Sequence, residues 1–214
     1  MRSLMAGKAV FSLIFFAVLF PFQAQAQMRA DALTEFRANN FEEAVRISLE
    51  EIEENANNLE AHVVASWSLI ELGRYDEALR LARSARVISR YDGRVIQILG
   101  EVHYFQGRNI EALRYFQEYI NLAPEGQRIH FVFFFMGEIY IRLGMFRHAD
   151  IALSTAVHRV PGNALWWSRL GYARENAGDL LAAITAYERA LALNAQLTDA
   201  SRGLLRSRQA LAGR

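Results

Sequence analysis

Apolar residues return along this chain at helical spacing, and a glycine interrupts them at short intervals. Phe133, Met136 and Tyr140 lie three or four positions apart, which places them on one face of a helix. Gly144 ends this pattern, and a second helical pattern follows until Pro161. Because glycine and proline interrupt helices, the stretch is predicted to form two helices joined by a tight turn.

This arrangement recurs with a fixed period. The alanine that follows each turn by five residues falls at Ala44, Ala78, Ala112, Ala149 and Ala183, in steps of 34, 34, 37 and 34 residues. The irregular step is a three-residue insertion near Gln127–Ile129, after Pro124. A period of about 20 to 50 residues indicates stacked supersecondary units. Five units are predicted, at residues 25–58, 59–92, 93–126, 130–163 and 164–197.

The predicted fold is all-α, an α-solenoid of about five antiparallel helix pairs. The units occupy residues 27–197 of the chain that remains after processing, and the first of them is partial. Residues 198–214 continue the helical pattern as one more helix. Because the last unit of a solenoid has no neighbour, this helix is expected to cap the array.

The repeated positions resemble the tetratricopeptide repeat, whose pattern is W-x2-L-G-x2-Y, then A-x3-F, then P. Trp167, Leu170-Gly171, Ala183 and Tyr187 carry it most fully in the last unit. The third unit matches at Ile96, Leu99, Gly100, His103, Ala112, Phe116 and Pro124. The chain is therefore identified as a member of this family. The resemblance implies helix pairs that cross closely at the glycines, and a concave face, formed by the first helices, that holds a peptide or a partner's helix.

The first 26 residues have the pattern of a secretory signal peptide. Arg2 and Lys8 give a positive start, and residues 9–20 are an apolar run. Ala24-Gln25-Ala26 matches the small-x-small cleavage pattern, so cleavage is expected before Gln27. The run is shorter than the roughly 20 residues of a transmembrane helix, so we expect no membrane span after the signal is removed. An uncleaved anchor is the alternative.

Composition narrows the compartment and the partners. The formal net charge is +1, too small to indicate binding to nucleic acid or to an anionic membrane. The chain has no cysteine, so it cannot carry the lipid-bearing cysteine of a lipoprotein. With the signal pattern, this predicts a periplasmic or exported protein.

No group of residues has the spacing of a catalytic or metal site. The sequence has neither a phosphate-binding G-x-x-x-x-G-K-[ST] loop nor an H-E-x-x-H motif. No two of the five histidines stand four residues apart: they are His62, His103, His130, His148 and His158. We therefore expect no cofactor and no enzymatic activity.

The candidate partner-binding residues are aromatic and charged side chains at outward positions of the first helices, or beside these positions. They are Trp67, Arg94, Tyr104, Phe131, Phe134, Glu138, Arg142 and Tyr172. Large rings are enriched at binding hot spots, but they are equally common in cores. Two interpretations therefore stay open: rings that face the groove, or rings that pack against the adjacent first helix.

The leading hypothesis is a non-enzymatic periplasmic scaffold that binds a protein or peptide in its groove. By family resemblance its work lies in assembling a cell-envelope complex. The alternative is a ligand-carrying or accessory subunit of a transport system. That alternative expects an enclosed apolar cavity near Trp67 and Phe134.

Overall fold

The computed structural model describes residues 31–213, which form eleven helices. The predicted signal peptide lies outside this part of the chain. The helices are α1 (Ala32–Arg37), α2 (Phe41–Glu54), α3 (Leu59–Glu71), α4 (Tyr75–Ile88), α5 (Gly93–Phe105), α6 (Asn109–Leu122), α7 (Ile129–Arg142), α8 (Phe146–Arg159), α9 (Ala164–Ala177), α10 (Leu180–Leu193) and α11 (Thr198–Ala212). No strand occurs among these residues, and the predicted all-α solenoid is confirmed.

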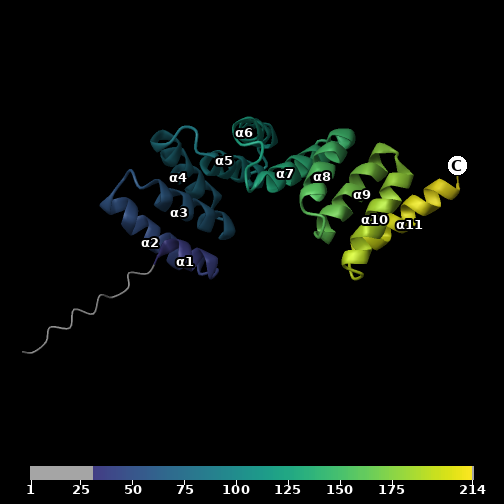
Figure 1. Ribbon diagram of the computed structural model, residues 1–214, viewed down its shortest axis with the longest axis horizontal. Helices are drawn as coiled ribbons and strands as arrows, with labels where there is room; N and C mark the ends of the chain where they lie inside the picture. Colours follow the sequence, from purple (N-terminus) through teal and green to yellow (C-terminus); the bar gives the residue numbers. More distant parts are fainter. Residues whose placement is uncertain (1–30, 214) are drawn as a thin grey trace, which may run out of the picture.

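The helices follow one another along the longest axis of the molecule, from α1 at one end to α11 at the other (Figure 1). Each helix packs against the next, and each first helix of a pair also contacts the first helix of the following pair. The core is accordingly a series of clusters along the array. None of the helices in residues 31–213 is both long and apolar enough to cross a membrane.

The turn between the two helices of a pair uses a left-handed backbone conformation in each of the five pairs. In the first pair the residue is Asn39, with φ of 63°. In the others it is a glycine with φ between 69° and 87°: Gly73, Gly107, Gly144 and Gly178. Glycine adopts this conformation without steric cost, and asparagine tolerates it better than most residues. This requirement explains the glycines that recur five residues before each alanine.

In the third, fourth and fifth pairs, the two helices cross at a glycine of the first helix. A Cβ atom built on Gly171 would lie 2.7 Å from the ring of Tyr187, and one on Gly137 would lie 2.5 Å from Cγ of Leu153. Gly100 is covered in the same way by the ring of Phe116. The close crossings therefore exist because a large side chain of the second helix lies directly on a glycine.

Candidate functional site

The first helices of successive pairs, α3, α5, α7 and α9, together with α11, lie side by side and form one surface, called here the first-helix face. Three hollows open between these helices. One lies at the carboxyl end of the chain, and two adjoin each other in the middle. Four of the eight candidate residues line these hollows, namely Trp67, Arg94, Phe131 and Tyr172. The other four do not.

Trp67 and Arg94 line the same hollow, one of the two in the middle of the face. The Trp67 ring is half-buried and lies 5.8 Å from the ring of Phe36, between centroids. Arg94 is held by two carboxylates, at 2.7 Å from Glu60 and 2.8 Å from Asp92. Arg94 therefore presents a neutralised charge to the hollow, whereas part of the Trp67 ring stays open.

Tyr104 supports the face more than it extends from it. Its side chain is buried, with 8% exposed. The guanidinium carbon of Arg142 lies 4.0 Å from the centre of the Tyr104 ring, and Arg142 Nη1 donates to the Tyr104 carbonyl oxygen at 3.1 Å. The ring does not belong to an exposed aromatic row, because neighbouring rings of α5 and α7 cover it.

Phe131 and Phe134 both contact Trp166 of the next first helix. Phe134 stacks on the Trp166 ring at 5.0 Å with an interplanar angle of 13°, and Phe131 meets it edge-on at 5.7 Å. Phe134 thus packs against the adjacent first helix, as the second interpretation expected. Phe131 additionally lies 5.0 Å from the guanidinium carbon of Arg128, and it lines a hollow.

Glu138 and Tyr172 share one arginine of α9. Arg169 donates to both carboxylate oxygens of Glu138, at 2.6 and 2.9 Å, and its guanidinium carbon lies 5.3 Å from the Tyr172 ring centre. A bidentate arginine–carboxylate pair is among the stronger hydrogen-bonded arrangements. Glu138 is therefore a satisfied structural partner, and Tyr172 is a half-buried ring at the edge of the hollow nearest the carboxyl end.

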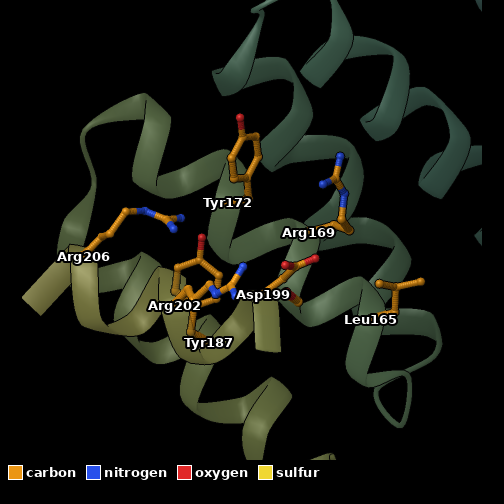
Figure 2. A pocket seen from close by; sticks show the side chains of 8 residues that line it. Leu165, Arg169, Tyr172, Tyr187, Asp199, Arg202 and Arg206 are labelled. Carbon is orange, nitrogen blue, oxygen red and sulfur yellow. The ribbon is translucent and has the colours of Figure 1, made fainter. Parts of the chain in front are cut away.

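The C-terminal hollow, between α9, α10 and α11, has a volume of about 350 Å³. Figure 2 shows its lining, which includes Arg169, Tyr172, Asp199 and Arg202. Arg206, also in this lining, binds Glu175 at 2.7 Å, and Tyr187 donates its hydroxyl to Glu175 at 2.6 Å. Burial, and then the Glu175 carboxylate, raises the pKa of Tyr187, which therefore remains a hydrogen-bond donor. Two of the three arginines in this lining, Arg169 and Arg206, are thus paired with carboxylates.

Two adjoining hollows lie in the middle of the first-helix face, and Arg128 lines both. The central hollow, of about 480 Å³, is lined by Ile70, Glu71, Tyr75, Glu101, Phe105, Arg128, Phe131 and Phe135. The lateral hollow, of about 380 Å³, is lined by Trp67, Asp92, Gly93, Arg94, Gln97, Tyr119, Ala123, Gln127 and Arg128. The Arg128 side chain thus lies between the two.

Polar groups around Arg128 are incompletely paired. Glu101 accepts a hydrogen bond from Gln97 Nε2 at 2.5 Å, but the nearest Arg128 nitrogen is 3.6 Å from its carboxylate. Gln97 Oε1, Arg128 Nε and Trp67 Nε1 are buried without a hydrogen-bond partner. Burial raises the pKa of Glu101, and the Arg128 charge opposes that shift only in part. This cluster contrasts with the paired charges at the carboxyl end.

A family comparison identifies the repeats in the carboxyl-terminal part of the array. The Tetratricopeptide repeat family matches the chain over residues 136–198. The chain contains tetratricopeptide repeats over these residues. No curated protein sequence matches it.

Solved structures share the tetratricopeptide repeat fold at low sequence identity. PilF of Pseudomonas aeruginosa is 15% identical, with a TM-score of 0.74, over 85% of this chain and 81% of that one. PilW, a type IV pilus biogenesis factor, is 16% identical, with a TM-score of 0.68, over 85% and 89%. YrrB, a tetratricopeptide repeat protein with an unusual peptide-binding site, is 19% identical, with a TM-score of 0.64, over 80% and 87%. At these identities the likeness is one of fold.

The tetratricopeptide register explains why Arg128 escaped the sequence prediction. Glu101 and Glu138 are 37 residues apart, the irregular step of the array, and so are equivalent. Glu138 pairs with Arg169, but Phe135 stands 34 residues before Arg169, where the equivalent arginine would be. Arg128 comes from the three-residue insertion, and it lies near Glu101 where the equivalent arginine would be, at 3.6 Å from the carboxylate. The 37-residue step was the one feature of the sequence that pointed to this region, and it indicated a loop and not a functional side chain.

Proposed function

We propose that this protein is a non-enzymatic periplasmic scaffold, which binds a segment of a protein partner on its first-helix face and takes part in assembling a cell-envelope complex. One observation carries the proposal. The middle of this face holds two adjoining hollows, whose rings and charged groups are only partly covered by the protein's own side chains. Surfaces with accessible aromatic side chains and polar rims are typical of binding sites.

Among the candidate residues, Trp67 and Phe131 are the ones we propose to contact a partner at the middle of the face. Each is half-buried and lines one of the two adjoining hollows. Tyr172 would extend the contact towards the C-terminal hollow. Arg94, Glu138 and Arg142 are engaged within the protein. We assign them, with Tyr104 and Phe134, to shaping the surface.

The structural neighbours support a role in binding and assembly. YrrB is described as having a peptide-binding site, and PilW as a pilus biogenesis factor. The signal pattern of residues 1–26, which lies outside the described part of the chain, supports export. The scaffold proposal combines these two indications with the surface.

The transport-subunit alternative is less well supported. It expects an apolar cavity near Trp67 and Phe134. The hollow beside Trp67 has Asp92, Arg94 and Arg128 in its wall, and Phe134 stacks on Trp166. Enclosed small-molecule sites are mostly apolar with few polar groups, and this hollow is not of that kind.

Site-specific photo-crosslinking in intact cells tests the proposal. A photoreactive phenylalanine analogue replaces Phe105, which is 40% exposed and lines the central hollow. The matched control places it at Val87, which is 88% exposed on the second helix α4. We expect one dominant protein adduct from position 105, in the envelope fraction, and none of that mass from position 87. Equal adducts from both positions, or recovery of the chain from the cytoplasm alone, would contradict the proposal.

A further inference from the structure

The central hollow combines aromatic rings with carboxylates. Tyr75 and Phe105 are stacked, with ring centroids 5.2 Å apart and an interplanar angle of 4°. Phe105 meets Phe135 edge-on at 5.9 Å, and Phe131 completes the aromatic part of the wall. The π-face of such rings carries partial negative charge, which attracts ammonium and guanidinium groups. This wall therefore favours a cation with apolar methylene groups behind it.

Two carboxylates face this wall. Glu101 is 5% exposed and has only the Gln97 hydrogen bond and the 3.6 Å contact to Arg128. Glu71 lies at the exposed rim, and within residues 31–213 its side chain has no hydrogen bond or ion pair. With Arg128 counted, the hollow holds one more negative than positive charge. The cost of burying a carboxylate is offset best by a hydrogen-bonded cation, so Glu101 would gain from a cation placed closer than Arg128.

Arg128 already occupies the hollow as an internal cation, but it is loosely held. Its guanidinium carbon lies 5.0 Å from the Phe131 ring centre and 5.7 Å from the Trp67 ring centre. Its contact to Glu101 is too long for a hydrogen bond, and its Nε atom has no partner. Arg169, by contrast, binds the equivalent Glu138 through two hydrogen bonds. Arg128 thus resembles a competitor that a better-placed cation can replace.

The geometry points to a subsite for a basic residue: the central hollow binds a lysine or arginine side chain of the partner, which pairs with Glu101 and Glu71 and displaces Arg128. This inference rests on the proposed function, because it specifies the chemistry of the segment bound on the first-helix face. The inference predicts that removing the Arg128 charge modestly strengthens the binding of a positively charged ligand. Removing the Glu101 charge should weaken that binding.

The probe is the tripeptide acetyl-Ala-Arg-Ala-amide, with its citrulline twin as a neutral control of nearly the same shape. Binding is followed by NMR through the indole N–H signals of the three tryptophans, with the Trp67 signal assigned from Trp67→Phe. The arginine peptide should shift the Trp67 signal as Arg128 leaves its ring, and the citrulline peptide should not. We expect Arg128→Gln to bind the arginine peptide about five-fold more tightly. The substitution removes the Arg128 guanidinium, whose cation–π contacts and ion pair compete with the peptide and are worth about 1 kcal/mol.

Three further variants complete the test. Glu101→Gln should weaken binding about ten-fold, and Glu71→Gln, at an exposed position, should weaken it by about two- to three-fold without a risk to folding. Glu138→Gln, at the equivalent position in the next repeat, should leave the affinity unchanged. Equal binding of the citrulline peptide, weaker binding by Arg128→Gln, or no binding at all would overturn the inference. If the arginine peptide fails while position 105 still crosslinks a partner, only this inference is wrong. If both fail, the proposed function is wrong as well.

Discussion

Two sections of the first-helix face each contain a glutamate at the equivalent repeat position, but the two glutamates are paired differently. In the section formed by α7 and α9, Glu138 is held by Arg169 at 2.6 and 2.9 Å. In the section formed by α5 and the loop before α7, Glu101 is 3.6 Å from Arg128, and three neighbouring polar atoms are buried without partners. The regular section is electrostatically complete, whereas the section with the insertion is not.

The proposed site follows from this difference between the two steps of the array. A regular step places an arginine of one repeat opposite the glutamate of the previous one, and both charges are satisfied within the protein. The longer step, with Phe135 at the arginine position, leaves the glutamate to a side chain from a loop. Incomplete pairing of buried polar groups costs stability, so it points to a use outside the folding of the chain.

The largest effect is expected from breaking the helix crossing of the regular section. Gly171→Leu would press a side chain into the fully packed ring of Tyr187, since even a Cβ atom would lie 2.7 Å from it. We expect a loss of about 3 kcal/mol in the free energy of unfolding, measured by urea titration. Gly162→Ala is the control, because a Cβ there meets no atom within 4 Å. An equal stability of the two variants would contradict the close crossing.

The two equivalent glutamates should respond differently to the same substitution. Glu138→Gln removes the carboxylate that holds Arg169 and leaves a half-buried guanidinium without its charged partner. This should cost about 2 kcal/mol of unfolding free energy. Glu101→Gln removes a buried charge that is poorly paired, and it should cost less than about 0.5 kcal/mol at pH 7 or stabilise the protein. If urea unfolding shows that both variants lose the same unfolding free energy, the two sections do not differ in the way described.

The pH dependence of stability sharpens this comparison. Burial raises the pKa of Glu101 above its usual value of 4.5, so the folded protein binds this proton more tightly than the unfolded chain does. The contribution of Glu101 to stability is therefore full below pH 4.5 and is lost as the pH rises through the raised pKa. The stability of Glu101→Gln relative to wild type should rise over this range, in urea unfolding at a series of pH values. A difference that stays constant with pH would show that Glu101 has its ordinary pKa.

The smallest effect concerns a buried histidine of the central section. His103 stacks on Tyr115 at 5.4 Å, and burial, with Arg108 and other nearby arginines, lowers its pKa below 6.5. Folding then favours the neutral ring, so stability should fall as the pH drops below 6.5 towards the lowered pKa. His103→Phe should flatten this part of the thermal melting profile. The exposed His158, changed to Gln, should not alter it.

The array could be predicted from the sequence because each repeated residue meets one structural requirement. Gly144 adopts a left-handed turn, and Gly171 lies under a ring, so periodicity alone predicted pairs of helices joined by tight turns. The site was harder to predict. Outward position on a helix did not reveal that Phe134 would stack on Trp166, or that Tyr104 would be covered. Arg128 belongs to no repeat position, so no pattern could assign its contacts.

Retention of the partner crosslinked at position 105 tests the central claim most directly. The comparison uses two double variants of a tagged chain: Glu71→Gln with Glu101→Gln in the central hollow, and Asp199→Asn with Arg202→Gln in the C-terminal hollow. Quantitative affinity capture should show at least a ten-fold loss of that partner for the first pair and near wild-type retention for the second. Loss through the C-terminal pair, with the central pair unaffected, would contradict the account.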